Sequence, residues 1–290
     1  PAGITANLTD VTILKPYQRG VQFNGAVHMS GTITVDNAGG NTDVWAVSGA
    51  DNGVLTCDAG TTLNINNTQF GFVANGTAVM SVDTVVIKDI SNDAIYKNGS
   101  GTMTIGTAIV EKNTTAKSAR YGVHMMNGKL TIGNLSIRDT GNTCINQTGG
   151  TSEFSNVTIQ DHANSHSVKM TVGTMTIHGG TIGKSNSNNV RTEGTSVLNL
   201  FGNVTINGTK GNNALCITAN SKLNIGSAEK VCNLTVNNAN QAAIAVNHDT
   251  TGKAGVVSAA GSTVTVNNAK YGIHAASEAQ IQLSNMVTNG

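Results

Sequence analysis

Charged side chains are scarce in this chain. Asp, Glu, Lys and Arg together make up 11% of its 290 residues, and the formal net charge is +1. An average globular domain carries about 25% charged residues. No basic stretch is interleaved with aromatic residues, so no nucleic-acid partner is expected. The apolar runs are far shorter than the roughly 18 residues of a membrane helix, so no membrane span is expected either.

Aromatic residues and proline are also rare, at 3% and 2 residues. The shortage of proline excludes collagen-like and proline-rich chains. The shortage of aromatic rings predicts a thin aliphatic core and argues against a sugar-stacking platform. The four cysteines are scattered and form no Cys-x-x-Cys pair, so we expect no zinc site, no other metal and no cofactor. A bridge between Cys216 and Cys232 would require an oxidising compartment.

Glycine, asparagine, threonine and β-branched residues are abundant, and they recur in a repeated pattern. In the segment 128–139, Leu130 and Ile132 flank Thr131, and the same alternation returns five residues later. This period of two residues indicates strands with one buried face. The segment predicts two short strands separated by a turn at Gly133-Asn134.

Variants of this segment follow along the chain, and each later repeat holds three strand patterns. The second pattern begins at Leu135, Val157, Val204, Leu234 and Val264. Imperfect periods of about 20–30 residues indicate a solenoid. We therefore predict an all-β fold, a single-stranded right-handed parallel β-helix of about ten coils with three short strands each. It is expected to form one domain over 1–290.

Three segments depart from the rhythm. Residues 1–60 predict less regular first coils or a cap. The polar segments 183–194 and 248–253 predict protruding loops. Insertions of this kind often carry the binding surface of a solenoid, although they also serve as plain solvated turns.

The repeated coils, the Val-Thr-Ile rungs such as 204–206 and the asparagine-rich corners resemble the pectin-lyase-like superfamily of right-handed parallel β-helices. The resemblance covers about Val11 to Leu283 and is closest to bacterial surface adhesins and autotransporter-type passenger domains. It implies an extracellular or cell-surface location in a bacterium. It also implies that the partners are glycans or host and matrix surfaces.

Aligning the second strands produces a column of short polar residues at one corner of the coils. Asn238 and Asn268 belong to it and resemble the asparagine ladder of these helices. Charged residues in and beside the column form the candidate ligand-binding set, together with two residues of the 183–194 segment. The set comprises Lys88, Asp89, Glu111, Lys112, Arg138, Asp139, Asp161, His162, Arg191 and Glu193. Mixed charges on neighbouring rungs suit a glycan or a carboxylate pair, but also a solvated corner with weak ion pairs.

A catalytic pattern is not recognised. Asn41-Thr-Asp43 of a polygalacturonase-like pattern occurs alone and too early, and no Asp-Asp pair accompanies it. We therefore assign no catalytic residues and expect an adhesin or binding module, most simply for glycans. Two alternatives stay open. One is a structural fibre or surface-layer subunit that assembles end to end, and the other is a polysaccharide lyase or hydrolase that uses Asp139 and Asp161.

Overall fold

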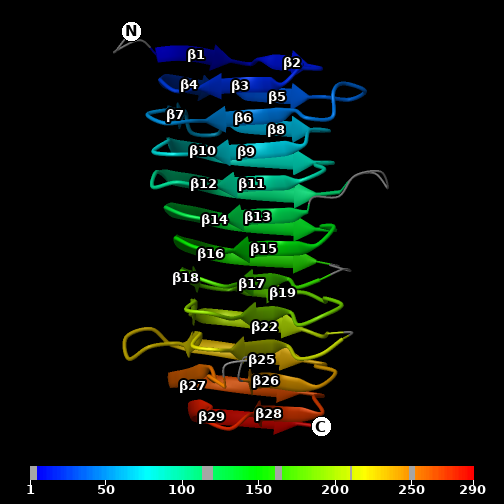
Figure 1. Ribbon diagram of the computed structural model, residues 1–290, viewed down its shortest axis with the longest axis vertical. Helices are drawn as coiled ribbons and strands as arrows, with labels where there is room; N and C mark the ends of the chain where they lie inside the picture. The colour runs from blue at the N-terminus through cyan, green and yellow to red at the C-terminus, as the bar shows by residue number, and fades with distance from the viewer. Residues whose placement is uncertain (1–4, 113–119, 161–164, 210, 248–251) are drawn as a thin grey trace. The chain divides into compact units, whose positions relative to one another are not determined.

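A computed structural model describes residues 5–112, 120–160, 165–209, 211–247 and 252–290. Every regular element in these ranges is a β-strand, and the strands form a right-handed parallel β-solenoid of about 11 turns. The predicted fold is confirmed. The chain divides into two compact units, Pro1–Gly141 and Asn142–Gly290, and within each unit the strands of successive coils lie side by side (Figure 1). The single domain predicted over 1–290 stays a prediction.

Unit 1 contains fourteen strands in its described residues, which pair in parallel from coil to coil. They are β1 (Thr5–Thr9), β2 (Thr12–Leu14), β3 (Arg19–Phe23), β4 (Ala26–Ser30), β5 (Thr32–Asp36), β6 (Trp45–Gly49), β7 (Val54–Cys57), β8 (Thr62–Asn66), β9 (Phe70–Ala74), β10 (Val79–Lys88), β11 (Asp93–Lys97), β12 (Thr102–Glu111), β13 (Tyr121–Met125) and β14 (Lys129–Arg138). Residues 1–60, predicted to be less regular, already pair with later coils, because β1 and β2 pair with β4 and β5.

Unit 2 contains fifteen strands in its described residues. They are β15 (Thr143–Gln147), β16 (Thr151–Gln160), β17 (Val168–Met170), β18 (Thr174–Ile177), β19 (Gly180–Ile182), β20 (Val190–Thr192), β21 (Val197–Leu200), β22 (Gly202–Asn207), β23 (Leu215–Thr218), β24 (Lys222–Ile225), β25 (Cys232–Asn237), β26 (Ala242–Asn247), β27 (Val256–Asn267), β28 (Tyr271–Ala275) and β29 (Gln280–Asn289).

The first two strands of a coil fuse into one long strand in several turns. β10 shows this directly, because Val79 pairs with Val54 of β7 and Thr84 pairs with Thr62 of β8. The predicted turn at Gly133-Asn134 is therefore wrong, since β14 continues through it. A Cβ on Gly133 would lie 2.5 Å from the carbonyl oxygen of Gly106, so glycine lets the two coils approach without leaving the ladder.

The core is aliphatic and thin, as the composition predicts. Leu130, Ile132 and Ile137 are fully buried, whereas Thr131 between them is half-buried. Burying a side chain of this size contributes about 1.5–3 kcal/mol. Columns of such side chains inside the coils, together with the parallel backbone ladders, stabilise each unit.

The corner column predicted from the second strands has a backbone cause. Asp89, Asp139, Gly208, Asn238 and Asn268 all have φ between 52° and 55°. Only glycine adopts this left-handed region freely, and asparagine and aspartate tolerate it better than other residues. The occurrence of Asp, Gly and Asn at these positions therefore follows from the left-handed turn that these five coils make here.

Amide ladders also exist, and the longest lies one residue before that corner. Its four members are Asn207, Asn237, Asn267 and Asn289, and each of the last three donates from Nδ2 to Oδ1 of the member before it, at 2.9, 2.8 and 2.9 Å. The predicted contact between Asn238 and Asn268 is confirmed at 3.2 Å. These amides satisfy one another, so the ladder needs no ligand.

The predicted loop 183–194 is wrong for residues 190–192, which form β20 between β17 and β23. The physical reason is the buried side chain of Asn189. Its Nδ2 donates to the carbonyls of Gly183 at 2.8 Å and Asn207 at 3.1 Å, and this holds the polar segment against the coils. Residues 248–251 of the second predicted loop lie outside the described residues.

All four cysteines are free thiols, so the bridge considered between Cys216 and Cys232 is absent. Both side chains are buried. Burial raises the pKa of the Cys232 thiol to about 11, which keeps this thiol protonated and unreactive at neutral pH.

Candidate functional site

Part of the predicted charged set does come together in unit 1. Lys88 pairs in register with Glu111, and their side chains form an ion pair of 2.7 Å between Nζ and Oε1. Val110 pairs with Ile137, so Glu111 and Arg138 follow one residue later on neighbouring coils. The charges therefore converge, but a half-exposed ion pair of this kind is worth at most about 1 kcal/mol.

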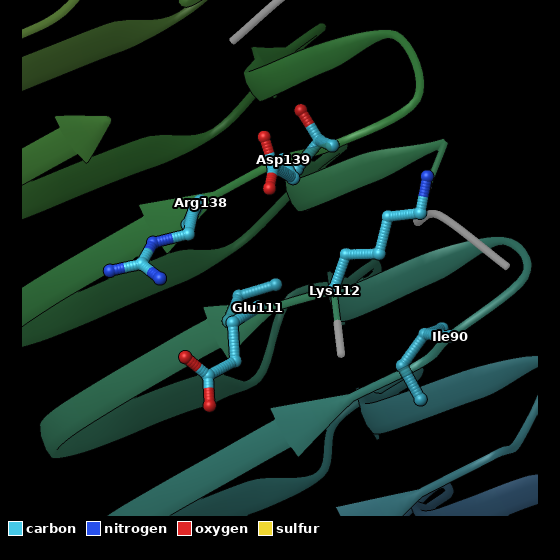
Figure 2. A pocket seen from close by; sticks show the side chains of 7 residues that line it. Ile90, Glu111, Lys112, Arg138 and Asp139 are labelled. Atoms are coloured by element: carbon cyan, nitrogen blue, oxygen red, sulfur yellow. The ribbon is translucent and has the colours of Figure 1, made fainter. Parts of the chain in front are cut away.

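The space beside these charges is small. Glu111, Lys112, Arg138 and Asp139 line a hollow of about 10 Å³. Figure 2 shows the side chains of Glu111 and Arg138 extending to one side of the strands and that of Lys112 extending to the other. Such a hollow holds about one water molecule, so no sugar unit fits inside it.

We call Lys88, Glu111 and Arg138 the charged strip. The remaining predicted residues do not extend the charged strip within the described part of unit 1. Asp161 and His162 lie outside the described residues. Arg191 and Glu193 belong to unit 2, where Glu193 contacts Arg191 at 2.9 Å and Lys169 at 3.1 Å. Burial opposes the charge of Glu193, but the hydrogen bond from Lys169 and the charge of Arg191 outweigh it and lower its pKa. In this cluster two cations share one carboxylate, so Glu193 is fully paired and a net charge of +1 remains.

A different surface of unit 1 brings four ring side chains together. Trp45, Phe70, Tyr96 and His124 lie on β6, β9, β11 and β13, which are successive strands of one sheet. Their ring centroids are 4.8, 6.1 and 5.4 Å apart along the series. We call this series the aromatic column. Its rings are tilted by 47° to 66°, so they do not cover one another's faces completely.

The aromatic column lines an open groove of about 390 Å³, which lies within the size range of small-molecule sites. Its lining comprises Trp45, Phe70, Asn75, Asn92, Asp93, Tyr96, Arg120, His124 and Met126. The three aromatic rings at 45, 70 and 96 are half-buried, so part of each stays accessible. Apolar ring surface beside amide, carboxylate and guanidinium groups is a typical composition for a ligand groove.

A buried carboxylate anchors the polar side of the groove. Asp93 is 2% exposed, and its Oδ2 lies 2.7 Å from Nδ1 of His124. Its Oδ1 lies 3.7 Å from Nε of Arg120, which is too long for a hydrogen bond. In the described part of the chain, three buried acceptors have no hydrogen-bond partner: Oδ1 of Asn37, of Asn92 and of Asp93. Buried acceptors without donors are rare in folded proteins, and two of these three belong to residues that line the groove.

Two guanidinium groups lie at the ends of the column. Cζ of Arg19 lies 4.2 Å from the ring centroid of Trp45, and Cζ of Arg120 lies 4.5 Å from that of Tyr121. Cation–π contacts of this kind hold a guanidinium flat while leaving its N–H donors available. Burial, and then the charge of Asp93, raise the pKa of Tyr96, so its hydroxyl stays neutral and donates to Sδ of Met126 at 3.0 Å.

The sequence did not predict this groove, because its few aromatic residues indicated no sugar-stacking surface. The available signal was spacing, since Trp45, Phe70, Tyr96 and Tyr121 follow one another at intervals of about one coil. In a solenoid, residues one coil apart occupy one face. A few aromatic residues therefore suffice to form a continuous surface.

Two further features are absent from the described residues. No helix there is long and apolar enough to cross a membrane. No group of three or more His, Cys, Asp or Glu side chains in these ranges is placed to hold a metal ion.

Comparison with protein-family models, with curated proteins and with solved structures found no match to this chain. The pectin-lyase-like resemblance and its adhesin type therefore stay predictions, while the parallel β-solenoid itself is observed.

Proposed function

We propose that this protein is an extracellular bacterial surface protein that binds glycans, as an adhesin or binding module. The aromatic groove of unit 1 carries this proposal. Sugars present apolar C–H faces that pack on aromatic rings and hydroxyls that pair with amide, carboxylate and guanidinium groups. Trp45, Phe70 and Tyr96 supply the rings, while Asn92, Asp93 and Arg120 supply the polar groups.

The groove suits this role better than the charged strip around Glu111. It offers about 390 Å³ instead of about 10 Å³. It also contains acceptors that lack donors, whereas Glu111 is already paired with Lys88.

A glycan array tests the proposal. Wild type is compared with Tyr96→Ala, which removes the central ring, and with Tyr17→Ala, which removes an exposed ring outside the groove. We expect Tyr96→Ala to weaken binding about 10- to 100-fold, as for an aromatic residue at the centre of an interface. Tyr17→Ala should bind as wild type does. Urea unfolding of each variant shows whether the fold is intact.

Four outcomes would count against the proposal. Silence of the wild type on the array would contradict glycan binding. Binding that survives Tyr96→Ala but is lost in Arg138→Ala would move the ligand to the charged strip. Cleavage of a bound glycan, assayed in the same samples, would replace the binding module with a lyase or hydrolase. Concentration-dependent filaments without glycan binding would favour the structural fibre.

A further inference from the structure

The aromatic column has a direction, and this direction constrains the ligand. Parallel in-register strands lie about 4.8 Å apart, so equivalent positions of successive coils form a line along the solenoid axis. Trp45 pairs in register with Phe70, and Tyr96 pairs with His124. Tyr96 lies opposite Val73 of β9, however, so the column shifts by three residues along the strands between Phe70 and Tyr96. The rings therefore repeat once per coil along unit 1, and they do not cluster around one point as in a cage.

We infer that the groove binds an unbranched oligosaccharide of three to four sugar units lengthwise, with about one sugar per coil of unit 1. This inference rests on the proposed function and specifies its ligand class. The spacing of the coils is close to the length of one pyranose unit in an extended chain. A linear glycan laid along the axis thus meets a new ring at each unit.

The polar groups of the groove are distributed in the same way. Asn75 follows β9, Asn92 and Asp93 begin β11, and Arg120 precedes β13. Each coil between β9 and β13 therefore contributes at least one hydrogen-bonding group beside its ring. In a linear glycan, each sugar unit presents its hydroxyls once per repeat. Both the rings and the polar groups of the groove also recur once per coil, so each sugar unit could contact one of each.

The ends of the column fit a chain of limited length. Arg19 lies over Trp45 at one end, and Arg120 lies over Tyr121 at the other. Each guanidinium occupies ring surface that a further sugar would need. The groove is lined by residues from the four coils of β6, β9, β11 and β13, so affinity should stop increasing beyond about four units.

Calorimetric titration with size-defined oligosaccharides tests the inference on wild-type protein. Three series of one to six units are used: cello-oligosaccharides, chito-oligosaccharides and oligogalacturonates. In at least one series, affinity should rise about threefold to tenfold with each unit up to four and then level off. Equal affinity for one and four units would overturn the inference while leaving glycan binding intact.

A variant at one end of the column adds a positional test. Trp45→Ala should weaken a four-unit oligosaccharide about tenfold but leave a two-unit one unchanged, because the shorter chain binds on the remaining rings. Tyr17→Ala serves as the matched control, and Trp45→Leu replaces Trp45→Ala if that variant does not fold. Equal losses for both lengths would contradict lengthwise binding.

Lengthwise binding of a linear oligosaccharide and glycan binding in general are contradicted by different results. If none of the three series binds, the groove is not a site for linear glycans, and this inference is overturned. If the array then shows binding of a branched glycan or a single sugar that depends on Tyr96, the proposed function still stands. If the array is also silent, both are wrong.

Discussion

The two units bury polar groups in different ways. In unit 1 three charged side chains are buried, Asp89, Asp93 and Lys97, and they are the only buried Asp, Glu, Lys or Arg residues in the described ranges. In unit 2 the buried polar side chains are amides and hydroxyls, together with His166. Amides both donate and accept, so a stack of them satisfies itself, whereas a buried charge requires a matched partner.

The amide ladder of unit 2 stabilises the fold, whereas the buried charge of Asp93 in unit 1 lies at a candidate binding site. In the ladder, Asn237 donates one hydrogen bond and accepts one, so its amide nitrogen and oxygen each have a partner within the protein. Asp93 is held by His124 on one oxygen and has an unpaired oxygen beside the groove. The chain thus places its costly polar burial in the unit that carries the aromatic column.

Lys97 provides the largest expected effect, because it is a fully buried lysine that has no carboxylate partner among the described residues. Its Nζ donates to the carbonyls of Asn98 at 3.2 Å and Gly99 at 2.8 Å. Burial lowers its pKa to about 8. Between pH 8 and about 10.5 the unfolded chain therefore holds a proton that the folded protein has lost, so stability gained from this residue rises with pH by about 2–3 kcal/mol.

In unit 2 an amide serves the corresponding role at the end of β15. Nε2 of Gln147 donates to the carbonyls of Gly150 and Thr174, both at 3.0 Å. Lys97→Gln should therefore remove the pH-dependent increase, measured as the difference between variant and wild type in urea unfolding at pH 7 and pH 10. Lys129→Gln, at an exposed lysine of the same unit, is the control. If the unfolding free energy of wild type and of Lys97→Gln changed equally between pH 7 and pH 10, the lowered pKa of Lys97 would be contradicted.

The fold was predictable because its determinants repeat. The alternation around Thr131 marks a buried strand face, and the 20–30-residue period makes such faces stack. The buried polar groups were not predictable. Nothing local distinguishes Lys97 or Asn189 from an exposed residue, because burial depends on which coil packs against them.

The amide ladder of unit 2 is the next test of the comparison. Nδ2 of Asn237 donates to Asn207 at 2.9 Å, and its Oδ1 accepts from Asn267 at 2.8 Å. Asn237→Ala removes both bonds and should cost about 1–2 kcal/mol of unfolding free energy. Asn233→Ala, which removes one exposed bond to Asn203, should cost less. Equal losses in urea unfolding would show that the ladder adds nothing beyond single bonds.

Of the candidate site, the sequence predicted the convergence of Lys88, Glu111 and Arg138 but not the groove. Convergence follows from strand register alone. The groove depends on coil lengths, which vary, so a column such as Trp45, Phe70 and Tyr96 is recognised only after the coils are aligned. A low aromatic content is compatible with such a groove, because each coil contributes only one ring to it.

The smallest expected effect concerns Asp139, which occupies a left-handed corner turn of a kind that occurs in both units. Its φ of 54° equals that of Asn268 in unit 2, so the backbone and not the charge explains the residue type. Asp139→Asn should leave stability within about 0.5 kcal/mol and glycan binding unchanged, because asparagine tolerates this conformation. Asp139→Ala should cost about 1–2 kcal/mol, as other residues do in the left-handed region. Urea unfolding and the glycan array measure both, and loss of binding in Asp139→Asn would restore this carboxylate to the site.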